Sequence, residues 1–406
     1  MRTRLLFWTA LWGLVGLLSA PAGAADGQPV DSPVPEGPFP GPARLLLPPS
    51  IPALEGLEAN LYFDNASLLL NPAAFVPDVT CAKGAQQVAR WTWTPKPEET
   101  GDHPLTLELR DGDNRIVARG STVIRVKARK PASPPAKPLS VLIIGDSLTA
   151  ASIYSQQIVD LAAADGLPIR LIGTRGPWAE AGGPPTANRH EGYGGWTAER
   201  FATAYTGVAR GGPYRECGSP FIYKDEADDK PRLDFARYCR EFNEGAPPDY
   251  VTILLGCNDT FGATDETIEE RIDTMFRHYE TLVAMIRDFG PDTRIGALLP
   301  MPPAATQDAF GANYGSGQTR WQYRRNQHRV VERMLETFGG QEAGGVFLVP
   351  AWLNLDPVHG FPAATTKAHV HSPVEVSRQS NGVHPSAEGY RQLGDAVYAW
   401  LRSFEG

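Results

Sequence analysis

Val141-Leu142-Ile143-Ile144-Gly145-Asp146-Ser147-Leu148 places a serine directly after a short apolar run that ends in glycine. The run has the composition of a buried strand, and helix-prone residues follow from Ser152. A strand that turns tightly into a helix leaves such a serine hydroxyl at the carboxyl end of a sheet, where α/β active sites form. The same residues also suit an ordinary strand-to-helix loop with a Ser or Thr cap, so their meaning depends on the rest of the chain.

Strand-like and helical patterns alternate on the C-terminal side of this stretch. We predict strands at 141–144, 169–172, 250–255, 294–299 and 346–349. We predict helices at 153–164, 234–242, 266–288, 321–338 and 387–404. Short apolar strands that alternate with helices indicate a parallel sheet covered on both faces.

The segment 44–129 has a different pattern. Short alternating or apolar runs are separated by turn signals such as Asp111-Gly112-Asp113-Asn114, with no long helical pattern. This predicts a small all-β sandwich domain of immunoglobulin-like type. Such a module is more often a spacer, packing partner or carbohydrate-binding unit than an enzyme. Residues 130–138 are proline-rich and are expected to form an extended linker.

The first 24 residues resemble a secretory signal peptide, with Met-Arg-Thr-Arg, an apolar run and Ala22-Gly23-Ala24. We expect cleavage after Ala24, with an uncleaved anchor as the alternative, and a secreted or periplasmic protein. Residues 25–43 read as a flexible leader rich in Pro and Gly. We expect no integral membrane segment after signal cleavage.

Composition limits the possible partners and the redox state. The 406 residues are 42% hydrophobic and carry a formal net charge of -8, which argues against a nucleic-acid partner. Export would permit disulfides, and Cys217 and Cys239 bracket one loop-rich stretch, so they are the favoured pair. Cys81 and Cys257 read as small buried residues.

Three later segments contain groups that acyl transfer needs at the carboxyl end of a sheet. Gly192-Tyr193-Gly194-Gly195 can turn backbone N–H groups toward a cleft, or can be only a tight turn. Asn258 follows the strand at 250–255 and can act as an oxyanion donor or as a helix cap. His384 lies on a loop before the last helix, where a histidine is often merely solvated.

The order Gly145-Asp146-Ser147-Leu148, Gly-Tyr-Gly-Gly-Trp-Thr at 192–197, Gly-x-Asn-Asp at 256–259 and x-Gly-Val-His-Pro at 381–385 resembles the SGNH, or GDSL, esterase family. The resemblance covers about 139–404. It implies that Ser147 is the nucleophile, that Ser147 N–H, Gly195 N–H and the Asn258 amide form the oxyanion hole, and that His384 is the general base. For the domain 139–406 it implies a flavodoxin-like three-layer α/β/α sandwich with a five-stranded parallel sheet.

One position departs from the family pattern. The family usually has an aspartate three residues before the histidine, and this chain has Asn381. Asparagine can orient the imidazole but brings no charge. We favour a Ser147-His384 dyad whose ring is oriented by a backbone carbonyl. A replacement carboxylate such as Glu375 and a weakened enzyme are the alternatives.

Two long loops flank the expected cleft, at 206–233 and at 300–319. The second leads into Arg320-Trp321-Gln322-Tyr323-Arg324-Arg325-Asn326. The arginine and aromatic side chains of this segment suit sugar binding. The alternative is a solvated basic helix face with an aromatic side chain packed inward. We expect no metal site, although His190, His359, His369 and His371 were candidates, because no cluster with ligand spacing accompanies them. We expect no cofactor.

These observations predict an exported serine esterase that hydrolyses short acyl esters, acetyl above all, on a carbohydrate. The substrate is expected to be a small-molecule or polysaccharide acyl ester. The carbohydrate part depends on export, on the β-sandwich and on the frequent use of the family in polysaccharide deacetylation. A lipase or lysophospholipase with the same residues is one alternative. A carbohydrate-binding pseudoenzyme, weakened by Asn381, is another.

Overall fold

The computed structural model describes residues 44–129, 135, 137–178, 185–207, 214, 216–226 and 230–405. The expected signal segment 1–24, the leader 25–43 and most of the linker 130–138 lie outside these residues. Among the helices that are described, none is both long enough and apolar enough to cross a membrane.

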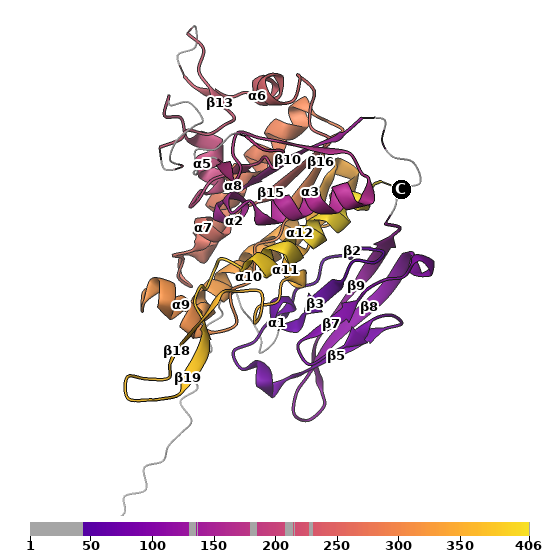
Figure 1. The fold of residues 1–406 in the computed structure, drawn as a ribbon, viewed down its shortest axis with the longest axis vertical. Coiled ribbons are helices and arrows are strands. Elements are labelled where there is room, and N and C mark those ends of the chain that lie inside the picture. The colour runs from indigo at the N-terminus through magenta and orange to yellow at the C-terminus, as the bar shows by residue number, and fades with distance from the viewer. Residues whose placement is uncertain are drawn as a thin grey trace, which may run out of the picture. The chain divides into compact units, whose positions relative to one another are not determined.

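A parallel sheet forms the centre of the C-terminal part (Figure 1). Its strands lie in the order β11-β10-β15-β16-β17, and the short β12 pairs with the end of β10 beyond β11. The strands are β10 (Leu139–Gly145), β11 (Ile169–Ile172), β12 (Glu191–Gly192), β15 (Tyr250–Leu254), β16 (Arg294–Leu298) and β17 (Val346–Val349). In this order the successive strands are added first on one side of β10 and then on the other. The carboxyl end of β10 is therefore a topological switch point, the position where α/β proteins typically bind ligands.

Helices cover the sheet. Figure 1 shows α3 and α12 lying together over one face, and α8 packs with α5, α6 and α10. The helices are α2 (Ser147–Ala150), α3 (Ile153–Asp165), α5 (Ala198–Thr203), α6 (Phe235–Phe242), α7 (Cys257–Thr260), α8 (Ile268–Phe289), α9 (Gln307–Tyr314), α10 (Arg320–Phe338), α11 (Ala351–Asn354) and α12 (Ala387–Arg402). Two short hairpins, β13 (Ile222–Tyr223) with β14 (Arg232–Leu233) and β18 (Ala363–Lys367) with β19 (Glu375–Gln379), lie outside the sheet.

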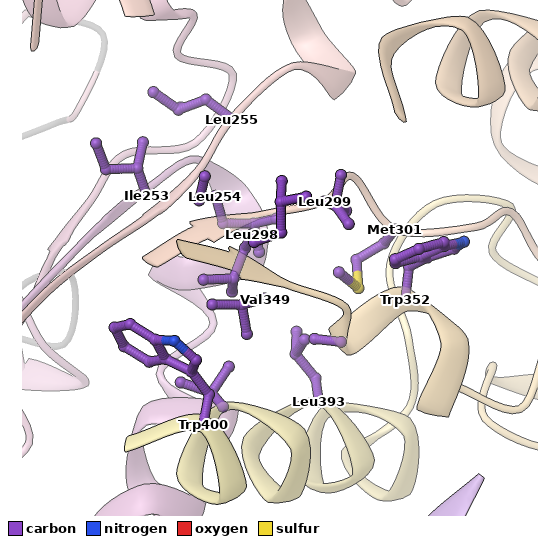
Figure 2. Close-up of a cluster of buried hydrophobic side chains, with 14 of the residues drawn as sticks. Ile253, Leu254, Leu255, Leu298, Leu299, Met301, Val349, Trp352, Leu393 and Trp400 are labelled. Carbon is purple, nitrogen blue, oxygen red and sulfur yellow. The ribbon is translucent and has the colours of Figure 1, made fainter. Parts of the chain in front are cut away.

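The core is continuous between the sheet and α12. Figure 2 shows Leu393 and Trp400 of α12 turned toward the strands that carry Ile253, Leu298 and Val349. All five side chains are at most 1% exposed. Burial of such side chains from strands and helix stabilises the layered arrangement by about 2 kcal/mol for each one.

Residues 44–127 form small β-sheets, as the sequence predicted. One sheet has the order β2-β9-β8-β5 and another the order β3-β7-β6, while β1 pairs with β4. The elements are β1 (Arg44–Leu45), β2 (Ser50–Leu54), β3 (Ala59–Tyr62), α1 (Phe63–Ala66), β4 (Ser67–Leu68), β5 (Val76–Cys81), β6 (Ala85–Gln86), β7 (Arg90–Trp93), β8 (Gly101–Arg110) and β9 (Ile116–Lys127). The pairing is antiparallel except between β2 and β9, which run parallel.

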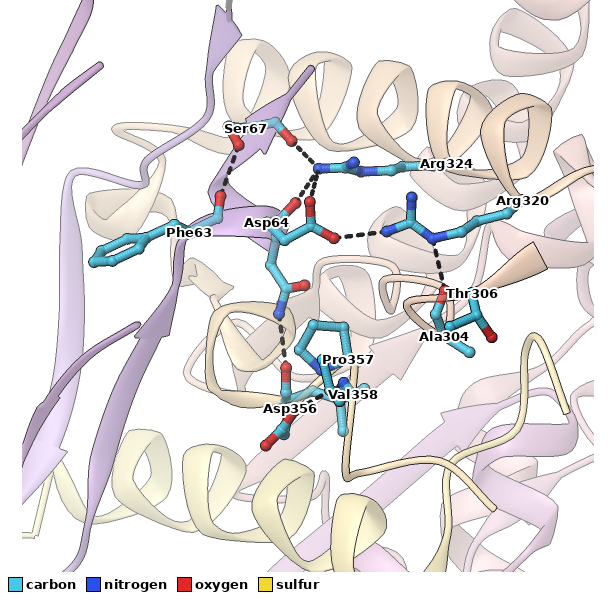
Figure 3. A network of polar contacts seen from close by, with 12 residues as sticks. Phe63, Asp64, Ser67, Ala304, Thr306, Arg320, Arg324, Asp356, Pro357 and Val358 are labelled. Carbon is cyan, nitrogen blue, oxygen red and sulfur yellow. Dashed lines mark hydrogen bonds and ion pairs between the residues drawn. The ribbon is translucent and has the colours of Figure 1, made fainter. Parts of the chain in front are cut away.

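Polar contacts join these β-sheets to the helices of the C-terminal part. Figure 3 shows Asp64 of α1 facing two arginines of α10, with Asp64 Oδ2 at 2.6 Å from Arg320 Nη2 and Oδ1 at 2.8 Å from Arg324 Nη2. Arg324, only 2% exposed, also donates to the carbonyl of Ser67. A buried charge of this kind is tolerated because it is paired and hydrogen-bonded. Arg320 and Arg324 therefore bind the N-terminal β-rich part, while Arg325 pairs with Asp265, so these arginines form neither the sugar-binding face nor the solvated basic face that the sequence suggested.

The α/β fold with a five-stranded parallel sheet is confirmed, and each predicted strand and helix of this part lies within two residues of its predicted bounds. Two expectations are wrong. The segment 300–319 is not a simple loop, because it contains α9. Cys217 and Cys239 are not joined by a disulfide, and both side chains lie in the buried apolar core.

Candidate active site

Ser147 begins α2, two residues after the end of β10. The preceding Asp146 caps the helix, because its carboxylate accepts a hydrogen bond from Leu148 N–H at 2.9 Å. Gly145 is required where strand and helix meet, because a Cβ there would lie 2.1 Å from Thr149 Oγ1 and 3.0 Å from the Leu254 carbonyl oxygen. The half-buried Ser147 hydroxyl is therefore held at the carboxyl end of the sheet.

His384 lies on the loop before α12 and brings its ring to Ser147. The distance between His384 Nε2 and Ser147 Oγ is 2.9 Å, although 237 positions separate the two residues. Burial lowers the pKa of His384 from its ordinary value, so the ring is neutral near pH 7. A neutral imidazole at this distance can accept the hydroxyl proton.

Gly195 lies on the turn that follows β12. Tyr193 N–H donates to the Gly145 carbonyl at 3.0 Å, which ties this turn to the end of β10. Gly195 has φ +75 and is exposed, with no heavy atom within 4 Å of the position of a Cβ. Within the described ranges, neither Gly195 N–H nor Ser147 N–H donates to a protein acceptor. Both donors are therefore open to a ligand.

Asn258 lies in α7, after Gly256 with φ +124. Its Nδ2 donates to the Trp196 carbonyl at 3.1 Å and to Asp146 Oδ2 at 3.2 Å. The Cys257 thiol donates to the same carboxylate oxygen at 2.8 Å. The Asn258 amide is thus fixed between the serine turn, residues 145–152, and the glycine turn, residues 192–197, and both of its N–H groups are engaged.

Two acidic side chains beneath the site have shifted pKa values. Burial raises the pKa of Asp146 to about 6, although hydrogen bonds from the Cys257 thiol and the Leu148 N–H lower it. Burial likewise raises the pKa of Asp259 to about 7, and Asp259 Oδ1 accepts a hydrogen bond from Ala198 N–H at 3.0 Å. Asp259 therefore joins α7 to the start of α5, just beyond the glycine turn.

Asn381 does not contact the imidazole through a hydrogen bond. Its Oδ1 accepts from Val383 N–H at 3.0 Å and from His384 N–H at 2.9 Å, so it shapes the loop backbone. Among the residues that the structure describes, no side chain or carbonyl bonds to His384 Nδ1. Within this described part, the backbone carbonyl that we expected at Nδ1 is not found. Glu375 does not replace it, because Glu375 is exposed on β19 and pairs in register with Lys367.

A second serine–histidine pair was not singled out from the sequence. Ser152 Oγ lies 2.7 Å from His190 Nε2, and both residues are at most 5% exposed. His190 Nδ1 accepts a hydrogen bond from Gly192 N–H at 3.0 Å, so the ring proton must be on Nε2. Burial, with the nearby Arg175 charge, lowers the pKa of His190 to about 3. His190 is therefore a donor to Ser152 and cannot activate it as a base.

The remaining histidine candidates form no metal cluster among the described residues. His359, His369 and His371 are exposed. Within the described part of the chain, no group of three or more His, Cys, Asp or Glu side chains is arranged to hold a metal ion. The segment 206–233 is described only in part, with β13 and β14 as its ordered hairpin.

Comparison with known proteins agrees with this arrangement. Residues 143–392 match the GDSL-like Lipase/Acylhydrolase family model, a range that includes Ser147, Gly195, Asn258 and His384. No curated protein sequence matches the chain.

Similar solved structures are distant. One is the gut microbial diltiazem-metabolizing enzyme BT4096, with 13% identity, 68% of this chain and 48% of that chain covered, and a TM-score of 0.38. Others are a carbohydrate acetylesterase family member from Sinorhizobium meliloti (16% identity, 66% and 99% covered, TM-score 0.32) and the acetylxylan esterase Axe2 from Geobacillus stearothermophilus (18% identity, 66% and 95% covered, TM-score 0.33). The chain thus spans about half the length of the first of these proteins.

Proposed function

Because the chain belongs to the GDSL-like lipase/acylhydrolase family, whose members hydrolyse ester bonds, we propose that Ser147 and His384 carry out this hydrolysis on short acyl esters, acetyl above all, of a carbohydrate. The observation that carries the proposal is the 2.9 Å approach of His384 Nε2 to Ser147 Oγ. The open N–H groups of Ser147 and Gly195 support it, because they can bind an oxyanion.

In the first step Ser147 Oγ attacks the ester carbonyl carbon, and its proton passes to His384 Nε2. The carbonyl oxygen becomes an oxyanion that accepts hydrogen bonds from Ser147 N–H, Gly195 N–H and Asn258 Nδ2. Asn258 would exchange its contact with Trp196 or Asp146 for this bond. The bond to the alcohol oxygen then breaks, and His384 returns the proton to the leaving alcohol. Water repeats the sequence on the acyl-serine, releases the carboxylic acid and restores the Ser147 hydroxyl.

The exposure of the site favours a short acyl group on a large substrate. Gly195 is exposed, and Ser147, Asn258 and His384 are half-buried, so the site is open enough to solvent among the described residues for an ester on a polymer to approach. Half-buried aromatic rings lie beside it, with Phe261 and Tyr314 packed on the cluster of Cys257 and Val383. Such rings offer an apolar surface to a sugar. Export to a secreted or periplasmic location, as the first 24 residues suggest, would bring the protein to polysaccharides.

The experiment compares wild type and Ser147→Ala on p-nitrophenyl acetate, a longer-chain ester and an acetylated polysaccharide. Ser403→Ala is the control, because Ser403 lies beyond the far end of α12, about 24 Å along the helix from the His384 loop. We expect wild type and control to release acetate from the polysaccharide, and Ser147→Ala to lose at least 10³-fold. Preference for the long-chain ester would indicate a lipid substrate. Inactivity of wild type on all three would indicate a binding protein.

A further inference from the structure

We infer that the buried pair Ser152 and His190 is a clamp that fixes the glycine turn against the serine turn, so that Gly195 N–H and Ser147 N–H face one oxyanion. The inference rests on the proposed function, because it concerns the same site. It assigns both residues as positioning residues, since neither contacts the reacting atoms.

One end of the clamp is the serine turn. Ser152 lies between α2 and α3, directly before the first residue of α3, and has φ +60, a conformation that residues with a side chain rarely adopt. Its hydroxyl donates to the Ala150 carbonyl at 3.2 Å and accepts from His190 Nε2 at 2.7 Å. Its carbonyl accepts from Asn188 Nδ2 at 2.8 Å. The strained residue is thus held by contacts with the segment that leads into the glycine turn.

The other end is the glycine turn. His190 Nδ1 accepts from Gly192 N–H at 3.0 Å, and the His190 backbone exchanges two hydrogen bonds of 3.0 Å with Arg175. Gly192 lies so close to α2 that a Cβ would be 2.6 Å from the Ala150 nitrogen. The imidazole therefore spans the two turns, with its Nδ1 bound to Gly192, which lies three residues before Gly195.

The two ring nitrogens have fixed roles in this clamp. Nδ1 accepts a hydrogen bond from a backbone N–H, so Nε2 carries the ring proton and donates to Ser152 Oγ. The Ser152 hydroxyl in turn donates a hydrogen bond to the Ala150 carbonyl oxygen. Every hydrogen-bonding group of the ring and of the hydroxyl is used once, and the ring is 1% exposed. A buried contact of this kind restrains the distance between the serine turn and the glycine turn. Oxyanion stabilisation needs this restraint, because the N–H donors of Ser147 and Gly195 act only when they are correctly positioned.

The test uses separate substitutions of His190 and of Ser152. His190→Asn can keep an acceptor for Gly192 N–H, and His190→Gln can keep a donor toward Ser152. Ser152→Gly removes the hydroxyl but accepts φ +60 without strain. The matched control is Tyr279→Phe, which removes one buried hydrogen bond, from Tyr279 OH to the Ile253 carbonyl, on α8. Each variant is assayed in the full chain on p-nitrophenyl acetate, with thermal unfolding measured alongside.

We expect kcat to fall about 10–100-fold in the clamp variants with KM changed less than about threefold, because displacing a donor costs less than the 10²–10³-fold of deleting one. Affinity for a trifluoromethyl ketone, which forms an oxyanion adduct with Ser147, is expected to fall in parallel. Tyr279→Phe is expected to lower the unfolding temperature and leave kcat unchanged. The acid limb of kcat/KM against pH is expected to persist in His190→Asn, because His384 sets it.

A kcat within twofold of wild type in folded clamp variants would overturn the inference, and so would loss of the acid limb, which would make His190 a base. If the ring variants fail to fold, Ser152→Gly decides by the same twofold criterion. The proposed function fails separately, because it requires Ser147→Ala to be inactive whatever the clamp variants do.

Discussion

Asn381→Asp tests how the catalytic imidazole is supported. In the structure Asn381 Oδ1 holds Val383 N–H and His384 N–H at 3.0 and 2.9 Å, and an aspartate keeps this acceptor. Its second oxygen adds a negative charge near a ring whose Nδ1 has no partner in the described chain. We expect the substitution to supply the charge that the site lacks and to raise activity.

The size of the effect follows from Coulomb's law. A unit charge about 5 Å from the imidazole, in an effective dielectric of about 40, stabilises the imidazolium by ~1.7 kcal/mol. This raises the pKa of His384 by about one unit and increases the plateau of kcat/KM about 10-fold. The active ring is neutral, so activity falls as the pH drops through its pKa. The acid limb must therefore move to higher pH by about one unit, opposite to the lowering that burial produces.

The assay is kcat/KM on p-nitrophenyl acetate from pH 4 to 9. Asn381→Ala serves as the comparison, because it removes the loop acceptor without adding charge. That variant is expected to lose activity, with its acid limb unmoved. If Asn381→Asp leaves both plateau and limb where they are in wild type, the native site is complete without a carboxylate and the reasoning is wrong.

Three further substitutions test other parts of the structure. Asn258→Ala is expected to lower kcat 10²–10³-fold with little change in KM or in circular dichroism, because it deletes one oxyanion donor. Asp64→Ala leaves the buried Arg324 without its carboxylate and is expected to reduce the free energy of unfolding in urea by about 3 kcal/mol. Gly192→Ala places a Cβ 2.6 Å from the Ala150 nitrogen, and it is expected to cost about 1–3 kcal/mol of stability and to lower kcat more than Ser403→Ala does.

The parallel sheet could be predicted because the local pattern of apolar residues indicates each of its strands and helices. Runs such as the one that ends at Gly145 are apolar throughout, and segments with a helical pattern lie between them. The meeting of Ser147 and His384 follows from the same topology, since both lie at the carboxyl edge. The hairpin β18–β19 was missed because its strands are largely exposed and present no apolar face.

Other features could not be predicted because their partners are remote in sequence. Arg320 and Arg324 appeared as an unpaired basic stretch, while their partner Asp64 is 256 residues from the first of them. The sequence predicts a Cys217–Cys239 disulfide from two cysteines that bracket one loop-rich stretch, but such spacing does not determine whether the two sulfur atoms meet in the fold. His190 was considered only as a metal ligand. Its position two residues before Gly192 was the one available signal of its contact with the glycine turn.

The two serine–histidine pairs show why residue type and distance do not assign a base. His190 is closer to its serine, at 2.7 Å, than His384 is to Ser147, at 2.9 Å. The difference lies in the other nitrogen. At His190 a backbone N–H occupies Nδ1, so Nε2 must donate, and the serine keeps its proton. At His384 no described group occupies Nδ1, so that nitrogen can carry the proton and Nε2 can accept one. A carboxylate facing Nδ1 would fix the tautomer in which Nδ1 carries the proton and Nε2 accepts one. Asn381→Asp should therefore strengthen the Ser147 site, while no substitution at Ser152 should create a catalytic site there.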